Sequence, residues 1–198
     1  TLDTNGAVAG VIDGGLGNNT LNARAAGANS WLINSSGNSV SNVTSFRNLQ
    51  TLNGGAGVDT FNLASDFGGA INGLDGDDIF NLTASVSGAL NGGAGADSFN
   101  LNALGLSVDG ISGGDTAGDT DTLQGANEDT LWSITSANSG TLANGKVVFN
   151  GIEKFVGGSG DDVFLLSKGV SLTNLLIDGG ADVAGDSVDM STLDGSLT

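Results

Sequence analysis

The chain carries one short motif again and again: GGAGVDTFN at residues 54–62, GLDGDDIFN at 73–81 and GGAGADSFN at 92–100. These three copies follow one another at a spacing of 19 residues. A further full copy, GGSGDDVFL, lies at 157–165, a degenerate copy, GGLGNNTLN, lies at 14–22, and two copies with longer turns begin at Gly113 and Gly179. A fixed period of this length indicates a repeat architecture, in which each unit is covered by its neighbours.

After its glycines each copy alternates apolar and polar residues, as in Phe61-Asn62-Leu63. Such alternation predicts a β-strand, and a second short strand such as Leu90-Asn91-Gly92 precedes the next turn. No proline interrupts these segments. We therefore expect an all-β fold, a parallel and right-handed β-solenoid (β-roll or β-helix) of about nine coils of 19–22 residues. Stacked at about 4.8 Å, the repeated phenylalanines would form a ladder inside it.

Two intervals between motif copies, residues 14–54 and 113–157, are about twice as long as the others and resemble each other. They align Trp31 with Trp132 and Phe46 with Phe149. We interpret them as an internal duplication, about 14–61 and 113–164, with two coils expected in each interval. Residues 1–198 are expected to form one continuous repeat domain, which we read as a fragment of a longer chain.

The composition excludes several classes of function. The 198 residues include 22 acidic and 5 basic side chains, giving a formal net charge of -17, and no Cys, His, Pro or Tyr. Thiol and histidine chemistry, disulfides and zinc sites are thereby excluded or disfavoured. Nucleic-acid phosphates and anionic membranes would be repelled, and no apolar run approaches the roughly 20 residues that span a bilayer. Cations are the favoured partners.

The stretch Gly-Gly-x-Gly-x-Asp-x-Phe resembles the calcium-binding nonapeptide of RTX proteins, the hemolysin-type secreted toxins, lipases, proteases and adhesins. The long units, with WSIT, GTL and VVFNGIEKF, are similar to units of large bacterial surface proteins of the hemagglutinin or adhesin kind. The resemblance implies Ca²⁺ held between turns of adjacent coils by backbone carbonyls and aspartates. Carried onto this chain, the implied ligands are Gly54, Ala56, Asp59, Gly73, Asp75, Asp77, Asp78, Gly92, Ala94, Asp97, Asp115, Asp119, Asp161 and Asp162.

The sequence departs from that family pattern in three respects. The motif occurs once per coil rather than in tandem, Leu74 replaces the second glycine, and Asn19 stands where aspartate is expected. The alternative interpretation is that Asp and Gly are simply turn residues, because Asp bonds locally to the backbone and Gly tolerates positive φ. Stacked carboxylates about 5 Å apart would repel each other, which favours bound cations over that alternative.

The residues and the resemblance together predict a calcium-stiffened structural or adhesive segment of a secreted or surface-displayed bacterial protein, and not an enzyme. Its expected partners are calcium ions, neighbouring repeats of the same polypeptide, and a host or bacterial surface glycan or protein. A second hypothesis is a binding module whose outward Asn rows, such as Asn62, Asn81 and Asn100, recognise glycan rather than bond to one another. Trp31 and Trp132 are candidates for carbohydrate stacking or for core packing. A third hypothesis is a polysaccharide-degrading β-helix enzyme using the Asp77-Asp78 or Asp161-Asp162 pair with a basic residue.

Overall fold

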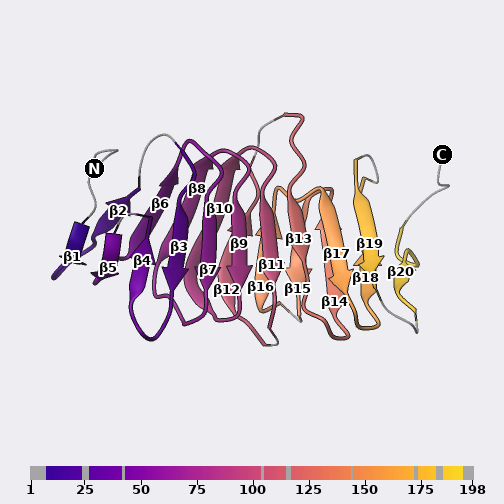
Figure 1. Cartoon of the computed structure of the whole chain (residues 1–198). Helices are drawn as coiled ribbons and strands as arrows, with labels where there is room; N and C mark the ends of the chain where they lie inside the picture. Colours follow the sequence, from indigo (N-terminus) through magenta and orange to yellow (C-terminus); the bar gives the residue numbers. More distant parts are fainter. Residues whose placement is uncertain are drawn as a thin grey trace.

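The computed structural model describes residues 8–23, 27–41, 43–103, 105–114, 117–143, 145–171, 174–181 and 185–193, and within these ranges the fold is all-β with no helix. Two sheets of ten strands each run along the molecule (Figure 1). In spatial order the first sheet holds β1 (Val8–Asp13), β5 (Val43–Arg47), β4 (Asn38–Val40), β3 (Ser30–Ile33), β7 (Thr60–Leu63), β9 (Ile79–Leu82), β11 (Ser98–Leu101), β13 (Thr122–Gln124), β17 (Lys154–Gly158) and β19 (Leu176–Gly180). The second holds β2 (Thr20–Asn22), β6 (Thr51–Gly55), β8 (Ala70–Asp75), β10 (Val86–Ala94), β12 (Val108–Ser112), β16 (Val147–Asn150), β15 (Ser139–Leu142), β14 (Leu131–Ser136), β18 (Val163–Leu166) and β20 (Ser187–Asp189).

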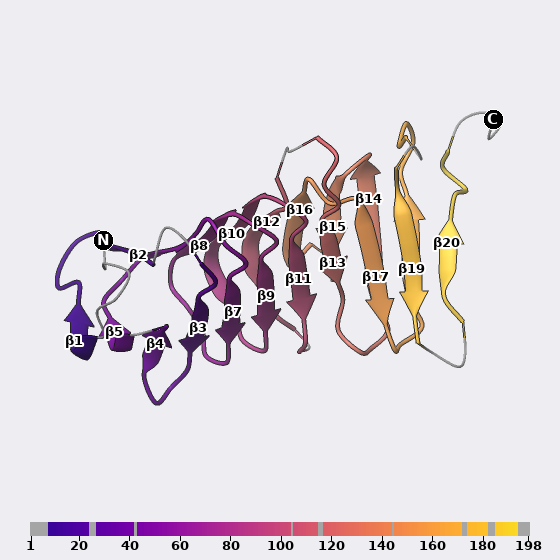
Figure 2. The ribbon, with the colours of Figure 1, turned by 45° about the horizontal axis from the view of Figure 1, so that its top comes forward.

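The middle of the chain passes regularly from one sheet to the other. From β6 to β13 successive strands alternate between the second and the first sheet, and each pairs in parallel with the strand one repeat later. The 19-residue spacing becomes a pairing register, because Phe61 lies beside Phe80 and Phe80 beside Phe99. Figure 2, the molecule tilted by 45°, shows these strands side by side along its length.

The core is a column of aromatic rings between the sheets. Phe61, Phe80 and Phe99 are fully buried, with ring centroids 4.9 and 4.7 Å apart and nearly parallel planes. This confirms the predicted phenylalanine ladder. Trp31 and Trp132 are also fully buried and stack on Phe61 and Phe164 at 5.4 and 5.2 Å. Of the two roles considered for the tryptophans, core packing is therefore the one found.

The two long intervals do not each hold two parallel coils, so that prediction was wrong. Each folds as a three-stranded antiparallel meander, β3–β4–β5 in the first sheet and β14–β15–β16 in the second. A parallel pair needs a crossover of roughly a dozen residues, whereas an antiparallel pair needs only a short turn. Residues 34–37 make such a turn, where the Asn34 side chain accepts the N–H groups of Ser36 and Gly37 at 2.8 and 3.0 Å. Because each sheet receives one meander, both sheets reach the same number of strands.

Leu74 occupies a backbone conformation that suits glycine. Its φ is +88°, and its side chain is 45% exposed, so little packing is gained in return. A left-handed non-glycine residue costs on the order of 1–3 kcal/mol, part of which the greater freedom of glycine in the unfolded chain would offset. We expect Leu74→Gly to raise the free energy of unfolding by about 1 kcal/mol in urea denaturation. Leu74→Ala is the matched control, because alanine keeps the strain; an equal gain in both variants would contradict this explanation.

Candidate cation sites at the glycine-rich turns

The motif aspartates end the turns and point into the molecule. Each directly precedes a strand: Asp59 precedes β7, Asp78 precedes β9 and Asp97 precedes β11. All three are fully buried. The equivalent residues of the later copies are Asp121 before β13, which is 4% exposed, and Asp162 before β18, which is fully buried.

One oxygen of each carboxylate bonds to the backbone of the neighbouring repeat. The N–H of Asp59 donates to Oδ1 of Asp78 at 2.7 Å, and the N–H of Asp78 donates to Oδ1 of Asp97 at 2.7 Å. The N–H of Asp97 donates in turn to Oδ1 of Asp121 at 2.8 Å. The aspartates thus form a continuous column that ties each turn to the next.

The other oxygen of these carboxylates has no donor. Oδ2 of Asp59, Asp78 and Asp97 is buried without a hydrogen bond. A Cβ on Gly73 would lie 1.9 Å from Oδ2 of Asp78 and 2.7 Å from the carbonyl oxygen of Gly92, so both oxygens face the same bare glycine. Gly54 and Gly92, the first glycines of the adjacent copies, are placed alike. Two acceptors thus meet in the interior with nothing between them to donate, and a buried polar atom left without a partner costs about 1–3 kcal/mol.

Burial, first of all, raises the pKa of these carboxyl groups. The pKa of Asp78 and of Asp97 rises to about 7, because desolvation disfavours the charged form and nearby carboxylates add repulsion. Desolvation likewise raises the pKa of Asp121 and of Asp162 to about 6. Burial also raises the pKa of Asp59. Each group can be relieved by a proton or by a cation.

The other predicted carboxylates lie on the outside of the turns. Asp75, Asp77 and Asp161 are exposed. Oδ1 of Asp77 accepts the N–H of Ala96 at 2.9 Å, and Oδ2 of Asp119 accepts the N–H of Gly95 at 3.1 Å. Asp115 falls outside the described residues. Over the described ranges, no three carboxylates gather into a group that could hold a metal ion.

The predicted carbonyl ligands are divided in the same way. The carbonyl oxygens of Gly73 and Gly92 face the column, beside Oδ2 of Asp59 and of Asp78. The carbonyl oxygen of Ala94 instead accepts the N–H of Gly76 at 2.7 Å. Gly54 contributes the bare face against which Oδ2 of Asp59 lies, and Ala56 is exposed at the tip of its turn. A cation between repeats would therefore meet one carboxylate and backbone carbonyls rather than a cage of acids.

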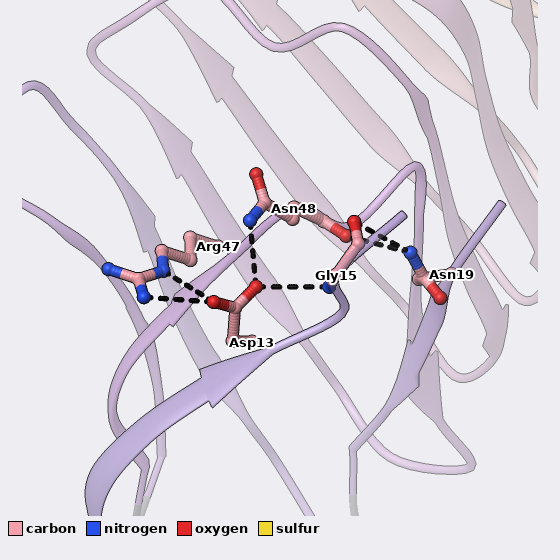
Figure 3. Close-up of polar contacts among 5 residues, drawn as sticks. All are labelled: Asp13, Gly15, Asn19, Arg47 and Asn48. Atoms are coloured by element: carbon pink, nitrogen blue, oxygen red, sulfur yellow. Dashed lines mark hydrogen bonds and ion pairs between the residues drawn. The ribbon is translucent and has the colours of Figure 1, made fainter. Parts of the chain in front are cut away.

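In the degenerate first turn, the amide of Asn19 stands where the later copies have a carboxylate (Figure 3). Nδ2 of Asn19 donates to the carbonyl oxygens of Gly17 and Asn48 at 3.1 and 3.2 Å, and those of Gly15 and Leu16 lie 3.5 Å away. Figure 3 draws the contacts with Asn48 and Gly15. A Cβ on Gly14 would meet the carbonyl oxygen of Asn48 at 2.2 Å, as one on Gly73 would meet that of Gly92. The turn therefore has a donor where the aspartate copies have none.

Beside that turn lies a surface ion pair. Asp13 accepts bonds from Nδ2 of Asn48 at 2.7 Å, the N–H of Gly15 at 3.0 Å and Nε of Arg47 at 2.9 Å, and the second guanidinium contact is 2.8 Å (Figure 3). The Asn48 bond, followed by the Gly15 and Arg47 bonds, lowers the pKa of Asp13 to about 2. Asp13 and Arg47, neither of them a predicted site residue, lie next to each other only because β1 pairs with β5.

In the second long unit, two acids take the positions that Asn19 and Gln50 hold in the first. Glu153 accepts the N–H of Asp121 at 2.9 Å, as Gln50 accepts the N–H of Asn19 at 2.8 Å. Glu153 also accepts a bond from the Asn138 side chain. A cleft of about 800 Å³ is lined by Asp119, Asp121, Asn138 and Glu153, among others. Sequence reasoning missed Glu153, although the aligned duplication offered a signal by placing Gln50 opposite it.

The outward asparagines bond to one another in two rows. Nδ2 of Asn72 donates to Oδ1 of Asn53 at 2.7 Å, and Nδ2 of Asn91 donates to Oδ1 of Asn72 at 2.6 Å. On the other sheet Asn81 donates to Asn62 at 3.0 Å, and Asn100 donates to Asn81 at 2.9 Å. The amide ladders considered from the sequence are therefore present, and they occupy much of the hydrogen-bonding capacity of both rows.

No family model, no curated protein and no solved structure matches this chain. The described part of the chain holds no helix long and apolar enough to cross a membrane.

Proposed function

We propose that the chain is a β-solenoid segment, stiffened by calcium, that acts as a stalk or spacer in a secreted or surface-displayed bacterial adhesin. Regular parallel pairing between repeats supports the solenoid architecture. The buried tryptophans and the bonded asparagine rows favour a scaffold over a glycan-binding face. Asp78 is buried while its sequence neighbour Asp77 is exposed, which disfavours a paired catalytic centre.

The observation that carries the calcium proposal is the row of carboxylate oxygens without donors. Oδ2 of Asp59, Asp78 and Asp97 lies beside carbonyl oxygens of the next repeat, and oxygen atoms of these two kinds are what Ca²⁺ prefers. In the proposed sites, Oδ2 of Asp59 and the Gly73 carbonyl would hold one ion, and Oδ2 of Asp78 and the Gly92 carbonyl another. Bound calcium would neutralise the column and join adjacent turns.

Calcium binding would make the stiffness of the segment depend on the calcium concentration of its compartment. A ligand that binds only the folded state stabilises it by RT ln(1 + [L]/Kd), which is about 1.4 kcal/mol per site at ten times Kd. Extracellular calcium modules have dissociation constants of about 10⁻⁴–10⁻³ M. The low calcium concentration of the cytosol would leave such sites empty. A net charge of -17 would add repulsion within the ion-free chain. The segment would thus remain loose before export and become rigid outside.

Thermal unfolding with and without calcium tests this proposal. We expect the midpoint of the circular dichroism transition to rise by several degrees between excess chelator and millimolar calcium, with two or more ions counted by calorimetry. Magnesium at the same concentration is the control, because it demands a tighter octahedral shell and loses water reluctantly. A strand-rich spectrum with the same midpoint in chelator and in calcium would leave the turns as purely structural elements and reject the calcium role.

A further inference from the structure

We propose that the first turn, residues 14–19, is an ion-independent version of the cation site. In this turn the Asn19 amide, supported by the Arg47 guanidinium, takes the place that a cation takes in the later turns. The inference rests on the proposed function and adds that the first turn has its donor without calcium, whereas the later turns need a bound ion.

The comparison between Asn19 and the motif aspartates carries the inference. Asparagine and aspartate have almost the same shape, but Nδ2 of asparagine donates where Oδ2 of aspartate can only accept. Nδ2 of Asn19 has four carbonyl oxygens within 3.5 Å, and two of them, at 3.1 and 3.2 Å, are well placed for its two hydrogens. Oδ2 of Asp78, in the equivalent turn, is buried and has no donor. A positive partner is therefore needed at Asp78 and is already present at Asn19.

The charges around the two turns point the same way. The first turn contains no carboxylate within residues 14–19, and the adjacent Asp13 is paired with Arg47 at 2.8 Å. The turn at 73–78 instead holds Asp75, Asp77 and Asp78. The first turn is thus close to neutral without ions, whereas the later turn carries uncompensated negative charge.

Converting the first turn into the aspartate form tests the inference. We expect Asn19→Asp, made in this 198-residue chain, to bind one more calcium ion than the parent by calorimetry and to lower the unfolding midpoint in chelator by about 2–4 °C. Asn18→Asp is the matched control, because it adds the same charge at the exposed neighbouring position and should change neither quantity by as much. Equal behaviour of the two variants, in ion count and in chelator midpoint, would overturn the inference.

The reverse exchange provides a second route, should Asn19→Asp fail to fold. Asp78→Asn keeps an oxygen for the N–H of Asp59 and supplies a donor toward the Gly92 carbonyl. We expect one ion fewer and a midpoint in chelator raised by about 2–4 °C, unlike Asp109→Asn, which removes an exposed charge outside the turns. A lower midpoint in chelator than that of Asp109→Asn would contradict the inference.

These outcomes separate the two proposals. A parent chain that binds no calcium would reject the proposed function, while the chelator midpoints of the Asn19 and Asp78 variants would still decide whether an amide satisfies the turn. A parent chain that binds calcium, with Asn19→Asp gaining no ion and losing no stability in chelator, would leave the proposed function standing and reject this inference alone.

Discussion

Replacing Phe80 with alanine is expected to lower the free energy of unfolding by about 3–5 kcal/mol, measured by urea denaturation in saturating calcium. The ring is fully buried and stacked between Phe61 and Phe99 at 4.9 and 4.7 Å. Its removal loses the transfer free energy of the ring and leaves a cavity that cannot close. The sheets on both sides cannot approach, because their strands are held in register by the repeats above and below.

The matched control for this substitution is Ile79→Ala on the same strand. Ile79 alternates with Phe80 and is only partly buried, so it faces away from the column. Its truncation is expected to cost about 1 kcal/mol or less, as for most substitutions away from the core. Similar losses in the two variants would mean that the aromatic column is not the main source of cohesion between repeats.

In the presence of chelator, stability is expected to fall as the pH rises from about 4 to about 7. The pKa of Asp78 and of Asp97 is raised to about 7 in the folded chain, so the folded state binds more protons than the unfolded state across this window. The stabilisation is fully present below the unfolded pKa of about 4 and is lost as the pH passes the folded pKa. One pKa unit on one group corresponds to about 1.4 kcal/mol, so a shift of at least one unit on each of the two groups should give a loss of at least about 3 kcal/mol.

The opposite limb of the pH profile comes from Asp13. Its pKa is lowered to about 2, so its bonds to Asn48, Gly15 and Arg47 stabilise the fold above pH about 4 and are lost as the pH falls toward 2. Urea denaturation from about pH 2.5 to about pH 8.5 should therefore show a maximum of stability at about pH 4–5. The double variant Asp78→Asn, Asp97→Asn should make the decline toward neutral pH shallower, with the remainder due to the raised pKa values of Asp59, Asp121 and Asp162. A parent stability that increases from pH 5 to pH 8 in chelator would contradict the assignment of protons to the column.

Calcium should alter the same profile in a specific way. Above pH 7 the carboxyl groups of the column are charged, and a cation can take the place of each lost proton. We therefore expect calcium to raise the unfolding midpoint more at pH 8 than at pH 5. The reason is competition, since protons and calcium would share the same buried Oδ2 atoms.

The repeating part of the fold was predictable from the residues. Alternation places Phe80 inward and Asn81 outward, and a constant spacing of 19 residues places equal residues side by side in a parallel sheet. Alternation depends only on neighbouring residues, and the pairing depends only on one constant spacing. Each copy of the motif therefore folds in the same way. The long unit containing Trp31 was misread, because its apolar spacing fits two coils as well as one meander, and short turns such as residues 34–37 decide between them.

The candidate site was predictable in its residue types but not in its atoms. The resemblance assigned Asp59, Asp78, Asp97 and Asp162 to the matching position of the motif and added Asp75, Asp77 and Asp161 as extra local carboxylates. The structure separates the two sets, because the residue at the end of the turn is buried and those within the turn are exposed.

The repeat length, the alternating strands, the aromatic column and the acidic character of the turns follow from the residues alone, since each depends on neighbouring residues or on one fixed period. The fold was needed to show that Oδ1 of Asp78 and of Asp97 accepts an N–H of the preceding repeat, while Oδ2 of Asp78 lies without a donor beside a carbonyl of the next repeat, because neither neighbour is close in sequence. The same holds for Arg47 beside Asp13 and Glu153 beside Asp121, which lie 34 and 32 residues apart. Contacts at that separation depend on how the meanders return the chain to the sheets, and no local pattern encodes that path.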